Sequence, residues 1–181
     1  MEINNNRIYL IGYMGSGKTT IGAKLAKKLG FEFIDIDHFI ENRQRKTISE
    51  IFSEKGEDAF RLIEHNALEE ISLFENVVIS TGGGAPCFYN NMELMNKSGF
   101  TVYLKTSPEE LTKRLSNAKN ERPLLKGKTT EEMQVFIAEN LEKRNHYYNQ
   151  ARLIFDAEQM LAKTDVDSIV ENLIIYLTQN K

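Results

Sequence analysis

The feature that most constrains this chain is a glycine-rich stretch, Gly12–Thr19, with the letters GYMGSGKT. It matches the phosphate-loop pattern G-x-x-x-x-G-K-[ST]. An apolar run at 8–11 precedes it, and a helical pattern from Ile21 to Leu29 follows and stops at Gly30. A buried strand, a glycine loop and a helix form the context in which this pattern binds phosphate. We therefore predict a nucleoside triphosphate site here, rather than a plain glycine turn before a helix.

The residue types in this loop suit an anion. Glycines let the backbone curl so that successive N–H groups point inward, and the helix that starts here adds its positive end. The Lys18 ammonium can reach the β- and γ-phosphates, and the Thr19 hydroxyl can ligate Mg²⁺. The candidate nucleotide-binding residues of this segment are Gly15, Ser16, Gly17, Lys18, Thr19 and Thr20.

Strand and helix patterns alternate along the rest of the chain. This order predicts right-handed βαβ units around a parallel sheet, in one compact α/β domain of 181 residues. Ligands of such sheets bind beyond the carboxyl ends of the strands, so we expect the glycine loop and the segments after the strands on one rim. The expected strands are 8–11, 33–37, 77–80, 100–104 and 153–155, and the expected helices are 21–29, 38–43, 47–56, 57–74, a helix between 86 and 99, 107–116, 130–150 and 165–177.

Composition narrows the range of partners. The formal charge of −3, with scattered basic residues, argues against a nucleic-acid surface. The single cysteine, Cys87, excludes a disulfide framework and fits a reducing cytosol; we interpret it as a small buried apolar residue. We find no secretory signal pattern and no apolar stretch of membrane-spanning length. His38, His65 and His146 lack metal-ligand spacing, and we interpret them as structural.

Three classes of protein share the phosphate loop: GTP switches, motor-type ATPases and small-molecule kinases. The guanine-reading Asn/Thr-Lys-x-Asp element and the Asp-x-x-Gly switch of GTP-binding proteins are absent. Motor ATPases usually carry a hydrophobic strand that ends in adjacent acids, whereas here the third strand leads into Thr81-Gly82-Gly83-Gly84. A small-molecule kinase fits best.

The sequence resembles the shikimate kinases, in the nucleoside-monophosphate-kinase-like branch of P-loop proteins. The motifs that carry the resemblance span almost the whole chain: GYMGSGKT at 12–19, DID at 35–37, FRxxE at 60–64, GGG at 82–84, RPLL at 122–125 and RxxxY at 144–148. The resemblance implies a five-stranded parallel sheet of order 2-3-1-4-5 in a single domain, 1–181. Within it, 37–65 would be the acceptor-binding segment and 117–128 a mobile lid.

The resemblance also implies an acceptor site. Asp37 would hold and orient the acceptor hydroxyl, with a possible role as base. Arg61 and Arg144 would clamp the shikimate carboxylate, and the backbone of Gly83 would approach the ring hydroxyls. Arginine suits this role because its planar fork binds carboxylates through two hydrogen bonds. The alternatives are that Asp37 only caps a helix and that the arginines are solvated helix charges.

On the nucleotide side, the resemblance implies that Asp35 binds Mg²⁺ through water beside Thr19. Arg122 would come from the lid and join Lys18 on the transferring phosphoryl group. Arg114 would stack on adenine. The region after Arg152 shows no clear motif for further adenine contacts.

The implied activity is ATP-dependent phosphorylation of the shikimate 3-hydroxyl, with Mg²⁺, in chorismate and aromatic amino-acid synthesis. We expect a cytosolic monomer with small-molecule partners only. Two alternatives remain open at this point. One is a kinase for another small acceptor, such as gluconate or a nucleoside monophosphate. The other is a catalytically silent nucleotide-binding protein.

Overall fold

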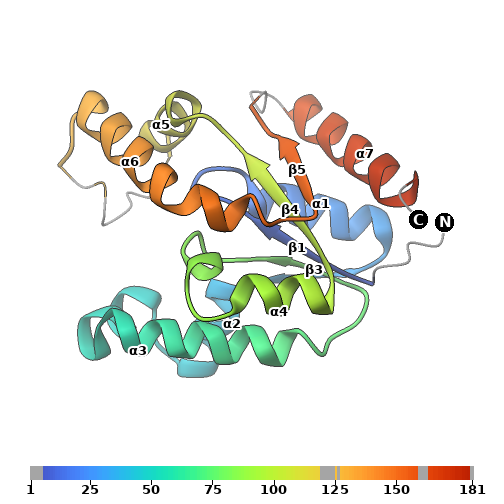
Figure 1. Cartoon of the computed structure of the whole chain (residues 1–181), viewed down its shortest axis with the longest axis horizontal. Helices are drawn as coiled ribbons and strands as arrows, with labels where there is room; N and C mark the ends of the chain where they lie inside the picture. The colour runs from blue at the N-terminus through green and yellow to red at the C-terminus, as the bar shows by residue number, and fades with distance from the viewer. Residues whose placement is uncertain (1–5, 119–124, 126, 159–162, 180–181) are drawn as a thin grey trace.

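The computed structural model describes residues 6–118, 125, 127–158 and 163–179. In these residues a five-stranded, all-parallel sheet has the order β2-β3-β1-β4-β5 (Figure 1). The strands are β1 (Arg7–Ile11), β2 (Glu32–Asp35), β3 (Val77–Ser80), β4 (Phe100–Lys105) and β5 (Leu153–Asp156). The predicted fold class and strand order are confirmed.

Helices cover both faces of the sheet. The helices are α1 (Lys18–Leu29), α2 (Ile36–Gln44), α3 (Ile48–Ile71), α4 (Asn91–Ser98), α5 (Pro108–Ser116), α6 (Thr130–Tyr148) and α7 (Lys163–Gln179), with a 3₁₀ turn, η1 (Ala85–Cys87). Apolar residues of α1 and α7 pack in one cluster with one face of β1, β4 and β5. Residues of α2, α3, α4 and α6 pack on the opposite face. The result is a three-layer α/β/α arrangement.

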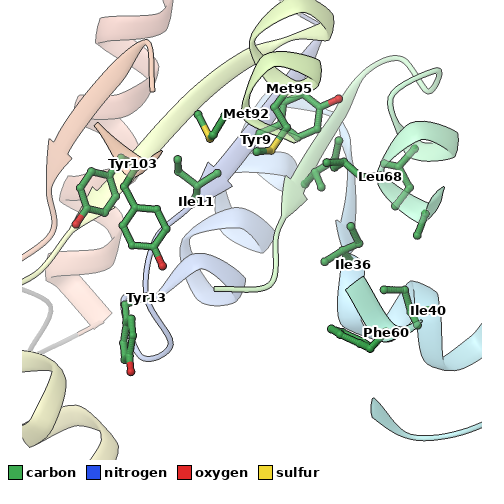
Figure 2. Close-up of a cluster of buried hydrophobic side chains, with 14 of the residues drawn as sticks. Tyr9, Ile11, Tyr13, Ile36, Ile40, Phe60, Leu68, Met92, Met95 and Tyr103 are labelled. Carbon is green, nitrogen blue, oxygen red and sulfur yellow. The ribbon is translucent and has the colours of Figure 1, made fainter. Parts of the chain in front are cut away.

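The central strand explains why this packing is strong. In β1, the four residues from Ile8 to Ile11 have no exposed surface, because both faces of a parallel strand are covered by helices. Tyr9 and Ile11 lie in the same cluster as Met92 and Met95 of α4 (Figure 2). Each such apolar side chain contributes about 1.5–3 kcal/mol through burial. The core therefore fixes the strand ends from which the phosphate loop and the neighbouring segments extend.

The predicted boundary at the second strand is wrong by two residues. β2 ends at Asp35, and α2 begins at Ile36, so Asp37 lies in the first turn of a helix instead of at a strand end. The N-cap is Asp35, whose Oδ1 accepts a hydrogen bond of 3.1 Å from the Asp37 N–H. The alternative in which Asp37 is itself the cap is therefore also wrong.

Other boundaries follow local chemistry. The capping box at Thr47 is confirmed, and Ser107 caps α5 with Pro108 in its first turn. Gly56 interrupts α3 with φ 79° and ψ 176°, so the two helices predicted on either side of it exist as one kinked element that ends at Ile71, not at Phe74. The helix predicted after Pro86 is a 3₁₀ turn followed by α4.

Among the described residues, the helices lack the length and apolar character needed to cross a membrane.

Candidate active site

The phosphate loop has the geometry that an anion needs. Gly12, Gly15 and Gly17 have φ values of 141°, 83° and 94°, a region that favours glycine. The loop turns straight into α1, which begins at Lys18 with Gly17 as its N-cap. The N–H groups that point out of the first turn of a helix, together with the helix dipole, create a positive site here.

Lys18 lies over this loop as a buried cation. Its Nζ donates hydrogen bonds of 2.8 Å to the carbonyl oxygens of both Gly12 and Tyr13, and its residue is 8% exposed. Ser16 is fully buried beside it, while Thr20 is exposed in the first turn of α1. The carbonyls hold the ammonium close to the loop, where a phosphate oxygen can compete for it.

Two side chains that carry oxygen atoms, Thr19 and Asp35, lie next to the phosphate loop. The Thr19 hydroxyl donates a 2.9 Å hydrogen bond to Asp35 Oδ2, which joins α1 to the end of β2. Hydroxyl and carboxylate oxygens are the ligands that Mg²⁺ prefers, and the ion keeps several waters. The donor set therefore fits Mg²⁺ beside the phosphate loop.

The turn after β3, Gly82–Gly84, which we call the glycine turn, brings the remaining candidate site residues together. A Cβ placed on Gly82 would lie 2.5 Å from Glu64 Oε1 and 3.3 Å from Asp37 Oδ1. A Cβ on Gly83 would lie 3.3 Å from the Met14 N atom of the phosphate loop. Because neither glycine carries a side chain, two carboxylates and the loop pack directly on this backbone. The structure thus places Asp37 close to the glycine turn, which in turn lies against the phosphate loop.

Arg61 points at the same turn from α3. A Cβ on Gly84 would lie 2.7 Å from Arg61 Nη2. The guanidinium donates to Glu57 Oε1 through Nε and Nη2, at 3.2 and 3.0 Å, and to Glu64 Oε2 through Nη1, at 2.8 Å. It also lies 4.3 Å from the centre of the Phe88 ring, a cation–π contact. With its side chain 11% exposed, Arg61 is a positioned cation and not a solvated surface charge.

Arg144 approaches from α6 on the other side. Its Nη1 donates to the Gly83 carbonyl at 3.4 Å, and its guanidinium lies 5.3 Å from the centre of the Tyr13 ring. The Tyr148 hydroxyl donates to the same carbonyl at 2.5 Å. Burial raises the pKa of the Tyr148 hydroxyl, although Arg144 acts to lower it, so this group remains a donor at neutral pH. Asp37, Arg61 and Arg144 therefore all lie against one turn, and Gly83, the fourth predicted acceptor residue, is part of that turn.

Arg114 lies beside the phosphate loop. Its Nη2 donates to the carbonyl oxygens of Ala157 and Glu158, at 2.8 and 2.9 Å, and its Nη1 to that of Gly15 at 3.5 Å. It joins the loop to the segment that follows β5. Residues 159–162, and Arg122 with most of the segment 117–128, lie outside the described residues.

The remaining reactive side chains take structural positions. Burial raises the pKa of the half-buried Cys87 thiol to about 11, so it stays protonated. The His65 ring stacks on Tyr89, and the His146 ring packs against Tyr147. His38 pairs with Glu41 on the surface. Within the described part of the chain, no group of three His, Cys, Asp or Glu residues is arranged to hold a metal.

Three groups for which the sequence predicts no role also lie in the site. Glu57 and Glu64 flank Arg61 at spacings of four and three residues, and Tyr148 follows Arg144 by four. On a helix these spacings place side chains on one face. This periodicity is a signal that could have identified Glu57, Glu64 and Tyr148 as neighbours of the two arginines.

Comparison with known proteins identifies the family. A family model described as shikimate kinase matches residues 14–174, which include almost all of the site described above. The chain belongs to the shikimate kinase family. A shikimate kinase of Parabacteroides distasonis is 58% identical over 168 residues, covering 93% of this chain and 97% of the relative.

Solved shikimate kinase structures agree in fold. The crystal structure of the Bacteroides thetaiotaomicron shikimate kinase superposes with a TM-score of 0.93 at 51% identity, over 95% of this chain and 98% of that one. The Acinetobacter baumannii shikimate kinase, solved in complex with shikimate, gives a TM-score of 0.82 at 35% identity, over 99% and 97%.

Proposed function

We propose that this protein transfers the γ-phosphoryl group of ATP to the 3-hydroxyl of shikimate, giving shikimate 3-phosphate and ADP on the route to chorismate. One observation carries this proposal beyond family membership. A carboxylate, Asp37, and two half-buried guanidiniums, Arg61 and Arg144, meet on one glycine turn that touches the phosphate loop. This arrangement suits an acceptor that has both a hydroxyl and a carboxylate.

In the proposed reaction, the acceptor hydroxyl oxygen attacks the γ-phosphorus, and the bond from that phosphorus to the bridging oxygen of ADP breaks. Asp37 orients the hydroxyl and takes its proton, which then passes to solvent. Lys18 and the N–H groups of the loop stabilise negative charge on the phosphoryl oxygens. Gly83 approaches the ring hydroxyls through its backbone.

Thr19 and Asp35 would hold Mg²⁺, directly or through water, beside Gly15, Ser16, Gly17 and Thr20. The bound ion supplies positive charge for the β- and γ-phosphates. Arg114 would lie against the adenine, and Arg122 would join Lys18 at the transferring group, a role that rests on the family resemblance alone. We further propose a single domain with acceptor segment 37–65 and lid 117–128. We also propose a cytoplasmic location, because ATP is the donor. We propose in addition that the protein is a monomer.

A coupled assay of ADP release, with and without shikimate, tests this proposal. We expect release that depends on shikimate and a phosphorylated product in equal amount. Gluconate and the nucleoside monophosphates serve as competing acceptors in the same assay. Turnover of one of these without turnover of shikimate would contradict the proposed substrate, and ATP binding without any product would favour a silent nucleotide-binding protein.

A further inference from the structure

Glu64 is the group in the site whose state the proposed reaction does not explain. It is 1% exposed and lies in the second half of α3. Its Oε2 accepts the 2.8 Å hydrogen bond from Arg61, but its Oε1 has no hydrogen-bond partner among the described residues. A buried carboxylate oxygen without a donor is costly, whereas a protonated carboxyl avoids most of that cost.

The charges around Glu64 are closely balanced. Arg61 faces it from α3, together with Glu57 on the far side of that guanidinium. Asp37 of α2 and Arg144 of α6 act on it from the other two helices, and Cys87 of η1 and Tyr148 of α6 face Arg144 as neutral groups at pH 7. Burial raises the pKa of the Glu64 carboxyl and Arg61 lowers it, while Asp37 raises it and Arg144 lowers it further, which leaves it at about 7.

An acceptor carboxylate would change this balance. It would take hydrogen bonds from Arg61 and Arg144, the two cations that now favour the ionised form of Glu64. It would also add a negative charge to a space that already holds Asp37 and Glu64. Carboxylates that share one buried site do not readily stay ionised together, because their negative charges repel each other.

We propose that Glu64 takes up one proton from solvent when shikimate binds, and that its protonated form releases Arg61 to hold the shikimate carboxylate. The proton binds Oε1, the oxygen without a partner. Glu64 is then a positioning residue that acts through Arg61. This inference rests on the proposed function, because it requires an acceptor with a carboxylate.

A pH dependence of affinity follows from linkage. Well below pH 7 Glu64 is already protonated, so shikimate binding needs no proton and its affinity is flat. Above pH 7 each binding event takes up a proton, and the dissociation constant rises by up to about tenfold per pH unit. Glu64→Gln mimics the protonated carboxyl and should remove this dependence while keeping an acceptor oxygen for Arg61.

Isothermal titration calorimetry of shikimate, without nucleotide, tests the proton directly. The wild-type protein is titrated at pH 6, 7 and 8 in PIPES and in imidazole, whose ionisation enthalpies differ. We expect the apparent binding enthalpies in the two buffers to differ. The difference should correspond to the uptake of a fraction of a proton at pH 7 and of close to one proton at pH 8. Glu57→Gln, which alters an exposed carboxylate on the same guanidinium, should keep this difference, and Glu64→Gln should lose it.

The outcomes separate this inference from the proposed function. Binding with equal enthalpies in both buffers would overturn proton uptake and leave the kinase activity standing. A buffer difference that persists in Glu64→Gln would overturn the assignment to Glu64. Absence of both shikimate binding and shikimate-dependent ADP release would overturn the proposed function itself. The wild-type buffer comparison needs no variant, so it decides whether a proton is taken up even if Glu64→Gln does not fold.

Discussion

At the scale of single residues, the site depends on three positions that have no side chain. Gly82 leaves room for two carboxylates, Gly83 lets the phosphate loop approach, and Gly84 leaves room for the Arg61 guanidinium. Arg61 and Arg144 are in turn held by carboxylates, rings and a carbonyl. The glycine turn therefore sets where the cations point, and a small change there should act on acceptor binding first.

Arg61→Lys should raise the Michaelis constant for shikimate with little change in that for ATP. Lysine keeps the charge but loses the planar fork that binds a carboxylate through two hydrogen bonds, and we expect an increase of about tenfold or more. Steady-state kinetics with each substrate varied in turn measures both constants. Arg152→Lys is the matched control, because this guanidinium bonds the Asn96 carbonyl away from the site. Equal weakening of both substrates would show that Arg61 does not serve the acceptor.

Gly84→Ala should weaken shikimate binding through the same guanidinium. The backbone at Gly84 has φ −89° and ψ −23°, which alanine adopts freely, so the added Cβ acts only by contact with Arg61 at 2.7 to 2.9 Å. The flexible end of Arg61 must move, and we expect a rise of about tenfold in the shikimate Michaelis constant. Combined with Arg61→Lys, the effects should be less than additive because both act on one group. Full additivity would contradict this explanation.

At the scale of elements, α3 is the part that places the acceptor side. Its first turns carry the capping box, Gly56 kinks it, and its second part carries Arg61 and Glu64 toward the glycine turn. The kink has φ 79° and ψ 176°, a region that only glycine occupies without strain. A Cβ there would meet nothing within 4 Å, so the requirement for glycine is conformational and not steric.

Gly56→Ala should lower the free energy of unfolding by about 1–3 kcal/mol, the cost of a side chain in this backbone region. Urea denaturation followed by circular dichroism measures the change. Ser53→Ala, an exposed position in the same helix, is the control and should be neutral or slightly stabilising because alanine favours helix. If Gly56→Ala matches the wild type in stability, the kink is not a strained feature of the folded state.

At the scale of the whole molecule, the packed sheet determines which charges are buried. The sheet is covered by helices on both faces (Figure 1). Glu64 is nearly inaccessible to water as a result of this packing. A carboxyl group that is buried in the folded protein and solvated in the unfolded chain links stability to pH.

Between pH 4.5 and about 7, Glu64 should make the protein less stable as pH rises. Its pKa is about 7 in the folded protein and 4.5 as the ordinary value, so the folded state binds more protons in this window. The contribution is fully present below pH 4.5 and is lost by about pH 7. Urea unfolding at several pH values measures it, and the slope in this window should be less negative in Glu64→Gln. Parallel curves for the two proteins would contradict a raised pKa.

Much of the fold could be predicted from the sequence because its signals are local. The phosphate loop, its flanking strand and helix, the capping box at Thr47 and the cap at Ser107 each depend on a few adjacent residues. The boundary at Ile36 could not be predicted in this way. Ile36 is fully buried and would suit a strand or a helix, and the choice was made by Asp35, which caps α2 with its side chain.

The sequence by itself determined a nucleotide loop and a set of acidic and basic residues with family spacing. Only the tertiary structure decided that Asp37, Arg61 and Arg144 meet on one glycine turn. It also buries Glu64 among them, with one oxygen that finds no hydrogen-bond partner in the described part of the chain. The physical reason is that burial and charge pairing depend on segments far apart in the chain. Local pattern fixes what a residue can do, and long-range packing fixes its environment.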